Sequence, residues 1–346
     1  MPKVTMRWRG GAHRLFVSAR IWVGVAVGLA ALYLAGRGTD LAQLTQIVAR
    51  VRLPFLGLAL VTSLVTLVAK GLRWRWLFYP QRPSLGVVPL TSLVAIGQAV
   101  NFLVPGRWGE LVRVYLAGEE GGIGKSYTLG TVAAEKLLDV VALALLILSL
   151  LPLLAMPDWL GERVTPIVAT SVSLVLAAAI LLAGRRIWLR LVDRALGLLP
   201  AAGAVRWRAR IVAGLDGLTA LRHHRAAVVV VGLTCGVWLA AALTNLSLLL
   251  AFHLPASLLI ALFLLAVLQA GVAVPSTPGK LGVFQYLCVL ALAVFRVPAA
   301  TAFGFSLVLY LTVVGTTCAW AALALWRRSW SLRRLAEATT AEGAGQ

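Results

Sequence analysis

The sequence predicts an all-α membrane protein with about six transmembrane helices and two oppositely oriented re-entrant helical hairpins that form an inverted repeat. Of its 346 residues, 60% are hydrophobic and only 13% are charged. The apolar residues gather in runs of about twenty, which is the length a helix needs to cross a bilayer. Two further apolar stretches are each interrupted by a Pro-Gly pair, and such paired breaks are typical of transporters with a site built from broken helices.

The predicted transmembrane domain covers residues 15–330, between a basic cytoplasmic N-terminus (1–14) and a cytoplasmic tail (331–346). We expect the first apolar run to be a retained helix, because no small-residue cleavage site precedes a soluble domain. The six predicted spans are 15–36, 54–78, 126–155, 164–184, 226–252 and 300–326.

The two breaks lie in the segments 87–120 and 256–295 and share one pattern. The first is Pro105-Gly106-Arg107-Trp108-Gly109, and the second, 173 residues later, is Pro278-Gly279-Lys280-Leu281-Gly282. Each pattern contains a helix breaker, a cation and two glycines. Two interpretations are open at this point: each segment is a hairpin that enters and leaves by one face, or each is an ordinary span with a kink.

The distribution of basic residues favours the hairpins. The net charge is +20, and the connection 185–225 alone carries nine arginines, so we expect that connection to be cytoplasmic. If both broken segments are hairpins, cytoplasmic segments hold 23 of the 32 Lys and Arg residues and outer loops hold five. The cluster Lys70, Arg73, Arg75 and Arg82 then faces the cytoplasm, and the run Arg73-Trp74-Arg75-Trp76 is interpreted as an interfacial anchor.

A shift of 173 residues maps the first half of the chain onto the second. Span 54–78 falls on 226–252, hairpin 87–120 falls on 256–295, and span 126–155 falls on 300–326. The predicted repeat units are therefore about 54–155 and 226–328, running through the bilayer in opposite directions. Span 164–184 and the basic connection 185–225 join them.

The chemistry at the breaks predicts a site for an anionic group. A half-helix that begins after a Pro-Gly pair leaves its first N–H groups unpaired, and Arg107 and Lys280 add a full charge at each break. Such a pair of positive ends suits a phosphate or another anionic head group. Gln98, Asn101 and Gln269 stand on the arms before the breaks, where an amide would contact a polar ligand or another helix.

More charged residues follow the first break. Glu110 and Arg113 lie just after it, and Glu135, Lys136 and Asp139 lie near the middle of the span 126–155. Glu135 and Asp139 are four residues apart and share a helix face. Each uncompensated charge at that depth costs about 2.5–3.5 kcal/mol, so these groups must pair, contact water or bind a ligand. They form either a functional network or a structural one in which Arg107 and Arg113 neutralise Glu135 and Asp139.

Other patterns exclude some classes of function. The three cysteines are isolated in apolar segments, the four histidines are scattered, and there is no nucleotide-binding loop, so no metal, disulfide or cofactor is expected. The basic connection carries apolar residues at helical spacing opposite arginines. It is interpreted as an amphipathic helix on an anionic leaflet rather than as a nucleic-acid site.

The sequence resembles the lysylphosphatidylglycerol synthase transmembrane, or flippase-like, family over residues 15–330. The resemblance rests on the stretch from Asn101 to Arg113, on Glu135-Lys136-Leu137-Leu138-Asp139, and on the stretch from Pro275 to Val283. It places these residues at motif positions: Pro105, Gly106, Arg107, Gly109, Glu110, Arg113, Glu135, Asp139, Pro278, Gly279 and Gly282. Two positions depart from the family pattern: Lys136 stands where arginine is common, and Gln285 stands where glutamate is usual.

The resemblance implies a multi-pass protein of a bacterial or archaeal cytoplasmic membrane that moves a lipid between leaflets. The expected substrate is an anionic or aminoacylated phospholipid or a polyprenyl-phosphate-linked intermediate. We expect no synthase domain and no enzymatic activity, because the chain ends about twenty residues after its last span. Two alternatives stay open: an intramembrane lipid-modifying enzyme with Glu135 or Asp139 as general base, and a scaffold for a separate synthase or glycosyltransferase. A homo-oligomer is also left open.

Overall fold

The computed structural model describes residues 26–81, 83–104, 108–153, 164–196, 201–271 and 278–327, and the secondary structure within these ranges is helical. Five helices are long and apolar enough to cross a membrane: α3 (Leu53–Leu77), α6 (Lys125–Leu150, continued by η1, Leu151–Leu153), α8 (Val164–Ala183), α11 (His224–Ala251) and α14 (Ala299–Arg327). Their ends lie within two residues of five predicted spans. The all-α polytopic fold is therefore confirmed.

The predicted first span, 15–36, is described only in part. Residues 26–36 form a short apolar helix, Ala26–Gly36, whereas 15–25, the N-terminus 1–14 and the tail 331–346 lie outside the described residues. A second short helix, α2 (Leu41–Ala49), follows it and was not predicted. The side chain of Asp40 caps α2 by accepting a hydrogen bond from the Ala42 N–H at 3.4 Å.

Each broken segment consists of two helices that pack against each other. The first holds α4 (Val87–Leu103) and α5 (Gly109–Gly121), and the second holds α12 (Leu258–Gly271) and α13 (Val283–Ala293), preceded by the short turn η3 (Pro278–Lys280). The chain thus changes direction near each Pro-Gly pair. Residues 105–107 and 272–277, which include Pro105, Gly106 and Arg107, lie outside the described residues.

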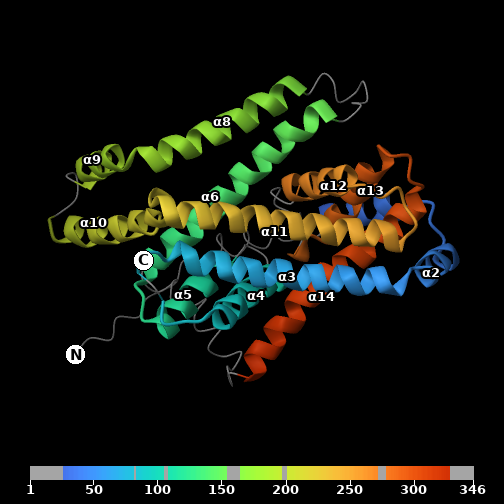
Figure 1. Ribbon diagram of the computed structural model, residues 1–346, viewed down its shortest axis with the longest axis horizontal. Coiled ribbons are helices and arrows are strands. Elements are labelled where there is room, and N and C mark those ends of the chain that lie inside the picture. The colour runs from blue at the N-terminus through green and yellow to red at the C-terminus, as the bar shows by residue number, and fades with distance from the viewer. Residues whose placement is uncertain are drawn as a thin grey trace, which may run out of the picture.

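Helices α3 and α11 pack along each other through the centre of the fold. Figure 1 shows α4 and α5 toward one end of this pair, and α12 and α13 toward the other. Helix α14 packs against α4 and α3, while α6 packs against α12 and α11. Helix α8 lies against α6 at the edge of the bundle (Figure 1).

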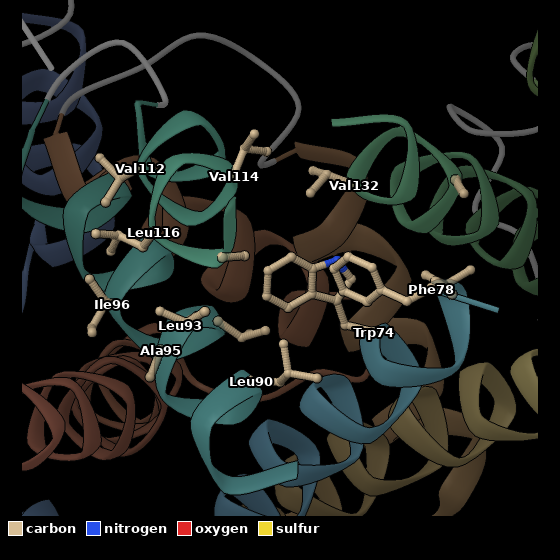
Figure 2. Close-up of a cluster of buried hydrophobic side chains, with 14 of the residues drawn as sticks. Trp74, Phe78, Leu90, Leu93, Ala95, Ile96, Val112, Val114, Leu116 and Val132 are labelled. Carbon is tan, nitrogen blue, oxygen red and sulfur yellow. The ribbon is translucent and has the colours of Figure 1, made fainter. Parts of the chain in front are cut away.

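One apolar core surrounds Trp74 of α3, and it corrects an interpretation of the sequence. Figure 2 shows Trp74 and Phe78 beside each other, with Leu90 and Leu93 of α4 nearby and Val132 of α6 on the other side. Trp74 and Arg73 are both 0% exposed. The prediction that Arg73 and Trp74 are part of an interfacial anchor is therefore wrong, although Arg75 is exposed as an anchor would be.

The basic connection 185–225 folds into helices α9 (Arg185–Leu196) and α10 (Ala201–Asp216), followed by the turn η2 (Thr219–Arg222). Helix α9 confirms the amphipathic helix, whereas α10 was not predicted. Asp193 of α9 accepts hydrogen bonds from Arg208 of α10, the shorter from Nε at 2.7 Å, and this lowers the pKa of Asp193 below its ordinary value. Helix α10 also packs against α6, so the connection is joined to the bundle.

Candidate functional site

A buried ion network joins α3 to α6. The Nη1 atom of Arg73 donates to Asp139 Oδ1 at 2.6 Å, and its Nη2 atom lies 3.2 Å from both Asp139 Oδ2 and Glu135 Oε1. Because Glu135 and Asp139 are one turn apart on α6, a single planar guanidinium reaches both carboxylates. The prediction that they share one helix face is confirmed.

Arg113 of α5 extends the network to the first hairpin. It forms an ion pair with Glu135 Oε2, donates from Nη1 to Glu135 Oε1 at 3.4 Å, and lies 4.0 Å from the centroid of the Trp74 ring. Trp74 in turn donates from Nε1 to the hydroxyl of Thr131 on α6 at 3.0 Å. The aromatic face and the carboxylate together hold the Arg113 guanidinium in place.

The partners of the two carboxylates differ in part from the prediction. Arg113 neutralises Glu135, and Asp139 is neutralised by Arg73, which was not among the predicted partners. Arg107 lies outside the described residues. A signal for Arg73 was available in the sequence, because Ser63, Thr66, Lys70 and Arg73 recur at intervals of three and four residues and form a polar stripe along α3.

Around the first break, Asn101 holds the two arms of the hairpin together. Its Oδ1 accepts from the Gly109 N–H at 2.8 Å, and its Nδ2 donates to Glu110 Oε2 at 3.0 Å. The other Glu110 oxygen pairs with Lys136 Nζ at 3.0 Å. Asn101 therefore satisfies an N–H at the beginning of α5 and links it to the carboxylate that contacts α6.

Asn101→Ala is expected to loosen this hairpin. It leaves the Gly109 N–H and one Glu110 oxygen without their partner, and each lost hydrogen bond is worth about 1 kcal/mol. We expect the thermal unfolding midpoint in detergent to fall, whereas Ser149→Ala, which removes an exposed hydroxyl bonded within its own helix, should change it little. Equal midpoints for the two variants would contradict this role of Asn101.

The second break is held in a different way. Gly279 has φ of 68° and Lys280 has φ of 59°, so the chain turns in the left-handed region that favours glycine. Tyr310 of α14 donates its hydroxyl to the Gly279 carbonyl at 2.8 Å. The Gly282 N–H donates to Gln285 Oε1 at 2.7 Å, while Gln285 is 0% exposed and its Nε2 atom has no hydrogen-bond partner among the described residues.

The two breaks, far apart in the sequence, lie next to each other. A Cβ atom on Gly279 would be 3.1 Å from the carbonyl oxygen of Phe102, which lies near the end of α4. Helix α4 also packs against η3. The described residues that flank the two breaks therefore lie in one region, as predicted. Residues 105–107 and 272–277 are outside the described part of the chain.

A cavity of about 140 Å³ opens inside the bundle between the two halves. Its lining comes from α3 and α4 of the first half and from α11, α12, α13 and α14 of the second. Gln98 and Gln269, both predicted site residues, line it from α4 and α12. The other polar lining residues were not predicted: Ser63, Thr66, Lys70, Thr244, Asn245 and Thr317.

The structure thus divides the predicted site residues into neighbouring groups. Asn101, Gly109, Glu110, Arg113, Glu135 and Asp139 form one chain of contacts, Gly279 and Gly282 shape the second break, and Gln98 and Gln269 line the cavity. Lys280 has a further interaction, and only the backbone of Pro278 is described. Among the described residues, no three His, Cys, Asp or Glu side chains gather as metal ligands would.

Comparison with known proteins supports the resemblance noted in the sequence. Residues 21–337 match the family described as the lysylphosphatidylglycerol synthase transmembrane region. No curated protein and no solved structure matches the chain. The matched range includes the motif residues that build the ion network and the second break. Because the match covers nearly the whole sequence, the chain belongs to the lysylphosphatidylglycerol synthase transmembrane family.

Proposed function

We propose that the protein is a translocase for a lipid with an anionic, phosphate-bearing head group. The observation that carries the proposal is a polar cavity inside an apolar bundle, lined from both halves of the chain and close to two helix breaks that meet. Irregular backbone at membrane depth is tolerated only where it is buried in protein or lines a cavity. A head group would cross through this interior while its acyl or isoprenyl chains stay in the bilayer.

The proposed architecture is an inverted repeat, and the packing of the helices supports it. In this repeat, helices α3, α4, α5 and α6 correspond to α11, α12, α13 and α14. For each pair of these helices that forms a principal contact, the corresponding pair is also in contact. For example, the contact of α4 with α14 becomes the contact of α12 with α6. A repeat with its site at the interface of the two units is typical of secondary transporters.

The lengths of the hairpin helices support re-entrant segments. Helices α4, α5, α12 and α13 contain 17, 13, 14 and 11 residues. At about 1.5 Å per residue, all four are shorter than the roughly 30 Å hydrocarbon core. Each pair would therefore enter and leave the membrane by the same face.

The topology can be tested with cysteines. In a chain whose three native cysteines are replaced, we expect Gly124→Cys, after the first hairpin, to be shielded from an impermeant thiol reagent added to intact cells. Ser257→Cys, before the second hairpin, should be labelled. Labelling of both positions, or of position 124 alone, would contradict an inverted repeat with cytoplasmic termini. Permeabilised cells provide the control that both cysteines can react.

The basic connection would lie on the anionic cytoplasmic leaflet. Ile187 and Leu191 of α9 are 59% and 46% exposed, and they share the helix with the arginines of that surface. Apolar and cationic groups on one exposed helix suit the boundary between head groups and acyl chains. We propose the cytoplasmic membrane as the location and a separate lipid or glycan synthase as a partner, with no role for nucleic acid.

The ion pairs of Glu135 and Asp139 favour translocation over catalysis. Both oxygens of Glu135 accept hydrogen bonds from arginine, and both oxygens of Asp139 accept from Arg73. An ion pair with arginine stabilises the charged form of a carboxylate, which weakens it as a general base. The enzyme alternative would require this network to open first.

One experiment separates the three candidate functions. Purified protein is reconstituted in vesicles containing radiolabelled phosphatidylglycerol, and both the retained lipid and any chemical product are analysed. We expect phosphatidylglycerol to be enriched on the protein relative to phosphatidylcholine and to be recovered unchanged. A protein-dependent product would support the enzyme, and a protein that enriches no lipid would support the scaffold.

A further inference from the structure

Lys70 is a cation inside the bundle whose charge the ion network does not neutralise. It lies on α3, one turn before Arg73, and lines the cavity with part of its surface accessible. Its Nζ atom forms no hydrogen bond or ion pair with any described residue. This differs from Arg73, Arg113 and Lys136, each of which pairs with a carboxylate.

The carboxylates near Lys70 are already occupied. Asp139 and Glu135 attract its charge while Arg73 and Lys136 repel it, and both carboxylates are already bound by Arg73, with Arg113 also binding Glu135. The third carboxylate, Glu110, pairs with Lys136. The described groups in this region therefore comprise four cations and three anions, and the surplus cation faces the cavity.

The rest of the lining suits the oxygen atoms of a phosphate. Gln98 and Gln269 present amide groups from opposite halves of the chain, and neither forms a hydrogen bond with another described residue. Amide N–H groups and an ammonium group both donate to phosphate oxygens. The apolar side chains of Leu67, Phe284 and Leu309 form other parts of the wall and reduce competition from water.

The size of the cavity limits what it holds. A volume of about 140 Å³ is roughly ten times the 10–15 Å³ that a cavity needs, by the same measure, to hold one water molecule. A phosphate with a small polar substituent fits this scale, whereas a pair of acyl chains does not. The apolar part of a lipid would have to remain outside the cavity.

We propose that Lys70, with Gln98 and Gln269, binds the phosphate of a phospholipid head group in this cavity. The proposal rests on the proposed function and names the group on the substrate that the protein recognises. In this proposal the principal positive charge of the site lies on the polar stripe of α3, whereas the sequence predicted it at the helix breaks. The amides then hold the phosphate from both repeats.

Binding of tritiated dioleoylphosphatidylglycerol in detergent tests the proposal. Lys70→Met removes the charge and keeps a side chain of similar length, Lys70→Arg keeps the charge, and Lys125→Met removes an exposed lysine of α6 as the matched control. We expect Lys70→Met to raise the Kd about tenfold or more, which is the effect of one lost charge-assisted hydrogen bond. Lys70→Arg should stay within about threefold of wild type, and Lys125→Met should bind as wild type does.

Competition distinguishes a lipid phosphate from a free one. Unlabelled phosphatidylglycerol should displace the label, whereas dioleoylglycerol, which lacks the phosphate, should not. Displacement by millimolar inorganic phosphate as strong as that by the lipid would instead identify a site for the free anion and overturn the lipid assignment.

The thermal unfolding midpoint shows whether each variant is folded. Lys70→Met should keep the midpoint of wild type, because no described partner loses an ion pair. Equal binding by wild type, Lys70→Met and Lys125→Met would overturn the role of Lys70 and leave the translocase proposal standing. Wild-type protein that binds no phosphatidylglycerol would contradict both, and a folded Lys70→Met that alone loses binding is the result that supports the inference.

Discussion

Arg73→Met is expected to lower the free energy of unfolding by about 3–5 kcal/mol, because it leaves Asp139 without its partner and Glu135 with only Arg113. Arg73 is 0% exposed and Glu135 is 4% exposed, so water cannot replace the lost guanidinium at Glu135, although it reaches part of Asp139. We expect most of this variant to be lost before purification or to unfold at a much lower temperature in detergent. Arg75→Met, two residues along the same helix and exposed, should change stability by less than about 0.5 kcal/mol.

A double variant separates the loss of the charge pair from the loss of packing. Arg73→Met combined with Asp139→Leu removes an acid and a base together, and Glu135 keeps its pair with Arg113. We expect the double variant to recover much of the stability lost by Arg73→Met alone. If Arg73→Met is as stable as Arg75→Met, the network is not what holds α3 to α6.

Gly109→Ala is expected to disrupt the first hairpin. A Cβ atom on Gly109 would lie 1.8 Å from the backbone carbonyl oxygen of Gly97 and 2.8 Å from the Asn101 side chain. Helices α4 and α5 would have to separate, and overpacking of this kind costs about 1–3 kcal/mol or more. The unfolding midpoint should fall, and the separation should also weaken the contacts of Asn101 and Arg113.

Gly232→Ala is the matched control. Gly232 lies on α11, and a Cβ atom there would meet no atom within 4 Å. Alanine is favoured over glycine inside a helix by about 1 kcal/mol, so this variant should be as stable as wild type or more stable. A Gly109→Ala protein with the stability of Gly232→Ala would mean that the two arms do not pack as closely as described.

The spans could be predicted because hydrophobicity and length determine them locally. Each of the five long helices, with η1 counted as part of α6, begins and ends within two residues of its predicted limits, and each broken segment forms two packed helices in the expected place. The pairing of Glu135 with Arg113 could also be anticipated, since few compensating charges are available at membrane depth.

Predictions that depended on which helices are neighbours were less successful. Arg73 was placed at the membrane surface because arginine and tryptophan are common there, but the packing of α3 against α6 buries both Arg73 and Trp74. The importance of Lys70 follows only when α3, α4 and α12 are seen to enclose one cavity. Helix α10 was missed because arginines interrupt its apolar residues, which do not form a long run of their own.

We propose that the protein moves an anionic lipid between leaflets, and translocation in proteoliposomes measures this activity directly. Phosphatidylglycerol labelled on its acyl chain with a fluorophore is placed in both leaflets, and dithionite is added to bleach the label that reaches the outside. We expect vesicles with folded wild-type protein to lose fluorescence beyond the outer-leaflet fraction, while vesicles that are empty or hold heat-denatured protein stop at that fraction. If vesicles with folded protein lose no more fluorescence than empty vesicles, both under a pH gradient and without one, the proposed lipid translocation is contradicted.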